Sequence, residues 1–306
     1  MRRKNLAMPD SQKAVGRDTD EGSHGAWRRQ VSDLVRAASG GFLFAVPLFY
    51  TMEVWWFGSW VHPAWVLGAL LASLAVVIVL NRTSGFRDSR VTNWRDAAID
   101  SVAVVAVALL CATVVLVCLR EITADDSLIE TTGKVVFEAI PFAVGAALAR
   151  QFLARREGAG DDGPPADLDV GSPAIARSLA DAGAAAVGAL VLSFSIAPTD
   201  EIPLIASAIT PPWLLLVVAV SLVISYAIVF EADFSDQAGR RRHEGLFQRP
   251  FPETAGAYVI SLAVAALVLL FFQRIGPDQS WETWAAWTII LGLPATIGGA
   301  AGRLAV

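Results

Sequence analysis

The chain has 306 residues, of which 55% are hydrophobic and 17% are charged, against about 25% charged residues in an average soluble domain. Its net charge is −5 and its mean hydropathy is +0.52. A soluble fold could not hide this much apolar surface, so the composition excludes a soluble domain and indicates an all-α, polytopic transmembrane helical bundle.

Eight apolar blocks are each long enough to cross a hydrocarbon core of about 30 Å. Residues 1–33 precede them and read as a disordered cytoplasmic tail without a signal-peptide core. Residues 154–176, rich in Gly, Asp and Pro, read as a flexible cytoplasmic linker between a first transmembrane half, 34–153, and a second, 177–306. The predicted spans are 37–60, 64–81, 97–119, 132–153, 179–208, 212–231, 254–273 and 283–305.

The basic residues predict the orientation in the membrane. Of the 24 Lys and Arg residues, 21 fall in the tail, in alternate loops or near the C-terminus. Only Arg120, Lys134 and Arg274 fall on the other side. Because cytoplasmic loops of membrane proteins carry an excess of Lys and Arg, both termini are predicted to be cytoplasmic.

The two halves align with each other. Residues 40–88 match 188–236 without a gap, with 11 identities in 49 positions, and residues 93–153 match 246–306 after a five-residue insertion. The matched residue types include Thr, Glu, Pro, Trp, Asp, Gly and Arg as well as apolar ones, which favours duplication over chance. Four spans per copy is an even number, so the two four-helix repeats should be parallel and related by a pseudo-twofold axis along the membrane normal.

Several segments are similar to those of one known family: GGFLFAVPLFYTMEVWW, FEAIPFAVGAALAR, IAPTDEIPLIA, YAIVFEADF, FQRPFPET and LGLPATIGGAAGR. From about residue 33 to its end, the chain resembles a family of bacterial integral membrane proteins of unknown function. The resemblance implies a multi-pass protein of the bacterial inner (plasma) membrane, and it implies no activity, substrate or catalytic residue.

Acidic residues inside the predicted spans are the main candidates for function, because an ionisable group at the bilayer centre costs about 2.5–3.5 kcal/mol. Glu53 and its repeat mate Glu201 are predicted in the outer third of their spans, with Asp200 beside Glu201 and Glu138 at similar depth. These acids could instead lie in water or bond neighbouring helices. The candidate ion or proton site comprises Thr51, Glu53, Glu138, Thr199, Asp200 and Glu201.

Prolines accompany these acids. Pro198 and Pro203 flank the acidic pair, and Pro47 lies near Glu53, so both helices are expected to break there. Freed carbonyls at a break can coordinate cations. Pro141 and Pro294 are expected to interrupt their spans in the same way. The nearby glycines Gly145, Gly298, Gly299 and Gly302 are expected to serve close helix packing.

A second symmetric acidic set is predicted at the cytoplasmic side. Acids in the first turn of a helix are stabilised by its dipole, so helix capping or pairing with nearby arginines explains the set. A gate made of ion pairs is the alternative. The candidate gate residues are Asp88, Asp236, Asp100 and Glu253.

The sequence offers little for other chemistry. Cys111 and Cys118 lie seven residues apart in one apolar block and read as core residues, and the three histidines lie outside the spans. No catalytic, cofactor-binding or nucleic-acid-binding motif is found, so no catalytic residue, no cofactor, no nucleic-acid partner and no firm metal site are predicted.

Three functions remain. The favoured one is a transporter or channel for a small cation or protons, with an acidic site between the repeats. The first alternative is a non-transporting membrane scaffold or accessory subunit, and the second is a lipid-modifying enzyme. The lipid bilayer is the expected partner, and a homo-oligomer is an open option.

Overall fold

The computed structural model describes residues 31, 34–83, 94–158, 173–231 and 250–304, and all regular structure in these residues is helical. The first half contains an apolar helix, Leu34–Ala45, then η1 (Leu48–Tyr50) and α2 (Met52–Trp60). The second half begins with α6 (Pro173–Ile196) and α7 (Glu201–Ala208). The remaining helices are α3 (Pro63–Thr83), α4 (Trp94–Cys118), α5 (Leu128–Gly158), α8 (Pro211–Tyr226) with the π-helical turn η3 (Ala227–Glu231), α10 (Pro250–Phe271) and α11 (Trp281–Leu304).

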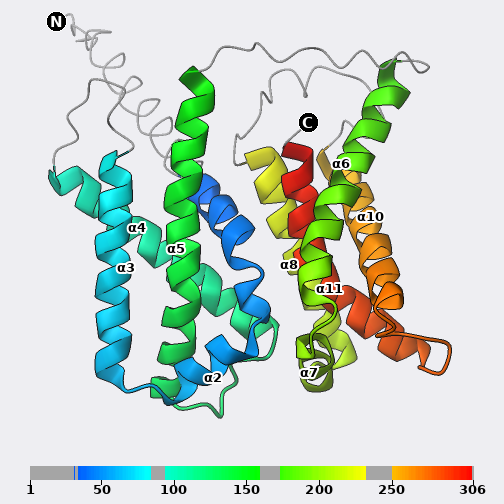
Figure 1. Cartoon of the computed structure of the whole chain (residues 1–306), viewed down its shortest axis with the longest axis horizontal. Helices are drawn as coiled ribbons and strands as arrows, with labels where there is room; N and C mark the ends of the chain where they lie inside the picture. The colour runs from blue at the N-terminus through cyan, green and yellow to red at the C-terminus, as the bar shows by residue number, and fades with distance from the viewer. Residues whose placement is uncertain (1–30, 32–33, 84–93, 159–172, 232–249, 305–306) are drawn as a thin grey trace, which may run out of the picture.

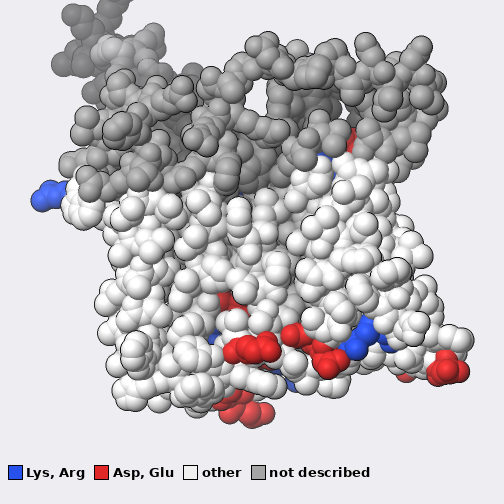
Figure 2. Space-filling view, in the orientation of Figure 1, with Lys and Arg blue, Asp and Glu red and all other residues white. Residues whose placement is uncertain are grey.

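Six described helices are long and apolar enough to cross a membrane, and a bent pair would make a seventh span. These six lie within α3, α4, α5, α8 with η3, α10 and α11, and they match six of the eight predicted spans. The all-helical membrane architecture is therefore confirmed. In the view of Figure 2 the described charged side chains gather mainly at one end, leaving a broad uncharged band that suits a hydrocarbon core.

The first predicted span of each half, 37–60 and 179–208, is not one continuous helix. Helix Leu34–Ala45 ends before Pro47, and α2 begins only after η1 and the extended residue Thr51. In the second half α6 and α7 meet at 89° across the turn that contains Pro198. The expected breaks are thus present, because a proline removes an amide donor and restricts the residue before it.

Two other prolines behave differently from the prediction. Pro141 lies inside α5 and Pro294 inside α11, and both helices continue through them. The expectation that these prolines interrupt their spans is therefore wrong. Neighbouring helices can support a proline within a membrane helix, and both α5 and α11 are largely buried by such neighbours.

Each half packs around its last helix, as Figure 1 shows for α5 on one side and α11 on the other. The glycines make these contacts close. A Cβ atom on Gly188 of α6 would overlap the carbonyl oxygen of Gly298 on α11, and one on Gly302 would overlap that of Ala184. In the first half a Cβ on Gly145 would lie 2.5 Å from the Cβ of Phe44. The prediction that these glycines serve packing is confirmed.

The two halves are joined near the end that carries α2 and α7 (Figure 1). The indole N–H of Trp213 in α8 donates to the carbonyl of Cys118 at the end of α4, at 2.7 Å. The Arg120 guanidinium lies 5.2 Å from the centre of the same Trp213 ring. Separately, the Tyr50 hydroxyl donates to the carbonyl of Ile290 in α11, at 2.8 Å. These contacts place η1 and α4 of the first half against the second half.

Candidate functional site

The two helix breaks place the predicted threonines and acids at the starts of the short helices. Thr51 precedes α2, and its hydroxyl donates to the carbonyl of Pro47 at 3.0 Å. The Thr199 hydroxyl donates to the carbonyl of Ile196 at 2.6 Å. Each hydroxyl therefore takes up a carbonyl at the end of the preceding helical segment, and its lone pairs remain able to accept a proton or a cation.

The acid next to Thr199 has a basic partner that the sequence did not predict. Arg274, just beyond α10, bonds the Asp200 carboxylate at 2.7 Å and the Thr199 carbonyl at 2.8 Å. The Asp200 side chain is 80% exposed. The sequence gives no sign of this pair, because Arg274 is 74 positions from Asp200 and close to it only in the fold.

Glu53 and Glu201, which align with each other in the sequence, lie in different environments. Glu53, in the first turn of α2, is exposed. Glu201, in the first turn of α7, is 6% exposed, and its Oε2 atom has no hydrogen-bond partner among the described groups. The two acids thus occupy equivalent positions in the sequence and unequal positions in the fold.

Glu138 is the most deeply buried acid of the described chain. It lies in α5, its exposed fraction is 0%, and neither carboxylate oxygen forms a hydrogen bond of normal geometry with any described group. The buried indole of Trp55, from α2, lies beside the carboxyl group. Lys134, one turn earlier on α5, forms its ion pairs with Glu130 and Asp126 instead. Because a buried carboxylate without a counter-ion is costly, this site favours a bound proton or cation.

Lys134, the three acids that it contacts and Glu138 one turn further along α5 form a group that we call the outer cluster, after its predicted side of the membrane: Glu121, Asp126, Glu130, Lys134 and Glu138. The Lys134 ammonium lies 2.9 Å from the Glu130 carboxylate and 3.6 Å from that of Asp126. It also donates to the backbone carbonyl of Glu121 at 2.9 Å. Its side chain is 11% exposed. One ammonium is therefore held by two carboxylates and a backbone carbonyl, one helical turn from buried Glu138.

Glu121 lies outside the spans, and its pKa is raised to about 7, chiefly because the carboxyl group is partly buried. The nearby Lys134 ammonium opposes this rise in the pKa, and the Asp126 carboxylate adds to it. The ordinary value is 4.5, so folding disfavours the charged form. The protein should therefore lose stability as the pH rises from about 4.5 through about 7, and E121Q should remove this part of the loss. Thermal unfolding in detergent at acidic and alkaline pH measures the difference.

The matched control is Asp125→Asn, which neutralises an exposed acid of the same loop. This control should unfold with the pH dependence of the wild type. An E121Q protein that keeps the wild-type pH dependence would contradict the assignment.

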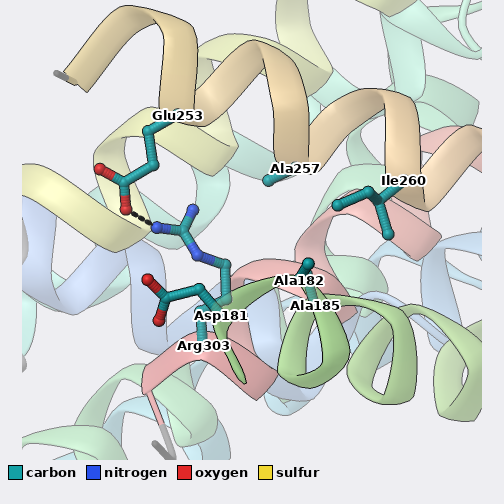
Figure 3. Close-up of a pocket in the computed structure, with 7 residues that line it drawn as sticks. All are labelled: Asp181, Ala182, Ala185, Glu253, Ala257, Ile260 and Arg303. Carbon is teal, nitrogen blue, oxygen red and sulfur yellow. Dashed lines mark ion pairs between the residues drawn. The ribbon is translucent and has the colours of Figure 1, made fainter. Parts of the chain in front are cut away.

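At the opposite end, part of the predicted cytoplasmic gate is described. Glu253 is buried in the first turn of α10 and forms an ion pair with Arg303 of α11 (Figure 3). Glu253 and Arg303 line a small pocket together with Asp181 of α6. Its volume of about 10 Å³ has room for about one water molecule. Asp100 is exposed, whereas Asp88 and Asp236 lie outside the described residues.

The outer acids do not converge on one metal position. Within the described residues no group of three or more His, Cys, Asp or Glu side chains is arranged to hold a metal ion. The predicted set divides into a buried pair, Glu138 and Glu201, and two acids that face water, Glu53 and Asp200.

Sequence reasoning missed Glu121, Arg274 and Arg303 as members of sites. It counted the two arginines only as topology signals. A signal was present, because the repeat offset of 153 residues places Glu121 on Arg274, and both follow the last turn of a predicted span. Comparison of charged residues at equivalent span ends would have drawn attention to both.

The fold and the apolar band define the class: a helical, multi-pass integral membrane protein that sits in a lipid bilayer. The chain belongs to the family described as "Putative integral membrane protein (DUF2391)", whose profile matches residues 33–306. No curated protein and no solved structure matches the chain.

Proposed function

We propose that this protein is a transporter or channel for protons or a small cation in a bacterial inner membrane. It consists of two tandem four-span repeats, residues 34–153 and 177–306, with both termini in the cytoplasm. The acids at the outer side carry the transported species, with Glu138 and Glu201 as the buried carriers. Thr51, Glu53, Thr199 and Asp200 then line the approach from the outer water. Asp88, Asp100, Asp236 and Glu253 belong to the cytoplasmic gate.

Matching local structure supports the repeat. Arg120 and Gln273, 153 residues apart, both have positive φ angles, 64° and 56°. The next residue in each copy donates its amide to the fifth residue back, Glu121 to Leu116 and Arg274 to Leu269. This is one helix-ending turn, built twice.

The loops that follow these turns also correspond. The Thr123 amide donates to the Asp126 carboxylate, and in the second half the Gly276 amide donates to the Gln279 side chain. The serine hydroxyls of Ser127 and Ser280 then accept the amide three residues later, at 3.2 Å in both copies. Turns that match at aligned positions support a common origin of the two segments.

The observation that carries the transport proposal is the Glu138 carboxyl, fully buried within a span, beside the Trp55 indole, and without a hydrogen bond of normal geometry or a counter-ion among the described groups. An intramembrane acid of this kind costs free energy in a protein that serves only as a scaffold. A carrier of protons or cations requires such a group, since the empty site must attract the positive charge that passes through it. The broken helices beside Glu201 add backbone carbonyls that can assist.

The test is flux through the full-length protein in proteoliposomes. Proton flux under a pH gradient, and uptake of Na⁺, K⁺, Ca²⁺, Mg²⁺ and Mn²⁺, are compared for wild type, Glu138→Gln and Glu201→Gln. Glu138→Gln is expected to abolish flux and Glu201→Gln to lower it. The control Glu282→Gln, an exposed acid in the first turn of α11, should transport as wild type.

Two results would overturn the proposal. One is a folded wild-type protein that moves neither protons nor any of these ions. The other is wild-type flux in folded Glu138→Gln. The scaffold would then be the better account.

A further inference from the structure

We propose that the transported species is the proton, and that Glu121 is the relay that passes protons between the outer water and Glu138, under the control of Lys134. This inference rests on the proposed transport function and adds a route, a second proton-binding residue and a controlling charge.

The route follows from the depth of the groups. Asp126 and Glu130 are partly exposed, at 20% and 32% of their side chains, whereas Glu138 is fully buried. Glu121, in the turn after α4, is half-buried as well, and it lies near enough to Glu138 for its charge to act on that carboxyl. The outer cluster thus combines partly exposed carboxyl groups with one that is fully buried.

Lys134 lies close to both Glu121 and Glu138. Its ammonium lies 2.9 Å from the Glu121 carbonyl oxygen, and Glu138 is one helical turn, about 6 Å, further along α5. The three side chains at 130, 134 and 138 recur every fourth residue, which places them on one face of the helix. The same ammonium therefore reaches toward Glu130 in the described state and toward Glu138 by a change of side-chain rotamer.

The chemistry favours a proton over a metal ion. A metal ion prefers several oxygen ligands around one point, and the described acids form no such group. Lys134 already supplies a positive charge among them. A proton needs only one carboxyl group at a time. It leaves water and binds the Glu121 carboxylate, and it then passes to the Glu138 carboxylate. Glu121 is thereby returned to its charged form.

The groups around Glu121 and Glu138 favour the order in which these two acids would bind the proton. Lys134 and Asp126 act on Glu121, and Glu121 and Trp55 act on Glu138, from α2, α5 and the loop after α4. The pKa of Glu121, about 7, lets this group bind and release protons near neutral pH. When Glu138 is charged it attracts the Lys134 ammonium, which removes the positive charge that opposes proton binding at Glu121.

The test measures the initial rate of proton flux against external pH for the full-length protein in proteoliposomes. The wild-type rate should show a transition near pH 7. E121Q should be slower by at least about tenfold, because a positioned acid–base group contributes about 10²–10⁴-fold to proton transfer, and it should lose the transition. Glu121→Asp, which keeps a titratable group, should restore it, and Lys134→Gln should move it to higher pH.

The control Asp125→Asn neutralises an exposed acid in the same loop and should match the wild type. Size-exclusion profiles establish that each variant is folded. If folded E121Q keeps the wild-type rate and transition while Glu138→Gln abolishes flux, the relay is overturned and the transport function stands. If the wild type moves cations and no protons, the proton assignment is overturned. If the wild type moves nothing, the transport function is overturned together with the relay.

Discussion

Replacement of Arg303 by Gln should lower the free energy of unfolding by about 3–5 kcal/mol, the cost of breaking a buried ion pair by removing one partner. Arg303 is 2% exposed, and Glu253, with which it pairs, is 7% exposed. The substitution removes the guanidinium that pairs with this buried carboxylate. Equilibrium unfolding in detergent by chemical denaturant measures the loss.

The exposed ion pair supplies the matched control for Arg303→Gln. Asp200→Asn breaks the contact with Arg274, but the Asp200 side chain is 80% exposed, so the expected loss is about 0–1 kcal/mol. The double variant Glu253→Gln with Arg303→Gln should lose less than the two single losses added, because the effects of substitutions at two residues in direct contact are not additive. Equal losses in Arg303→Gln and Asp200→Asn would contradict the role assigned to the buried pair.

The sequence was sufficient to predict most of the helices. Six predicted spans correspond to the described helices that are long and apolar enough to cross a membrane. This agreement has a physical cause, since hydrocarbon tolerates no unpaired backbone groups and a long apolar block has few options besides a helix. The breaks near Pro47 and Pro198 were also predictable, from the missing amide donor of proline.

The paths of the broken helices were not predictable. The 89° bend between α6 and α7 depends on how α7 packs against α11, which no local pattern encodes. The π-helical turn η3 after Tyr226 is a further example, because a wider turn is accepted or rejected according to its neighbours. Pro141 and Pro294 show the reverse case, in which packing preserves a helix that the local sequence disfavours.

For the candidate site, the sequence indicated the residue types and not their partners. The position of Glu138 within a span could be predicted from the apolar residues around it. The choice of Lys134 between Glu130 and Glu138 could not, because both lie one turn away on the same helix face. The Arg274 contact with Asp200 joins residues 74 positions apart, so only the fold brings them together.

The close contact between α6 and α11 at Gly188 predicts a second large loss of stability, for the substitution Gly188→Ala. Alanine normally stabilises a helix relative to glycine by about 1 kcal/mol. At Gly188, however, the added Cβ would overlap the backbone carbonyl of Gly298, which cannot rotate away as a flexible side chain would. Gly188→Ala should therefore cost about 1–3 kcal/mol of unfolding free energy, measured as above, because the helices must separate.

Gly183, on the same helix, is the matched control for Gly188→Ala, since a Cβ there meets nothing within 4 Å. Gly183→Ala should raise stability or leave it unchanged, so the two alanines are expected to differ in sign. The reciprocal variant Gly298→Ala should lower stability as well, because its Cβ would overlap the Gly188 carbonyl. A stabilising Gly188→Ala would mean that α6 and α11 are further apart in the membrane, and that the glycines of α11 serve something other than packing.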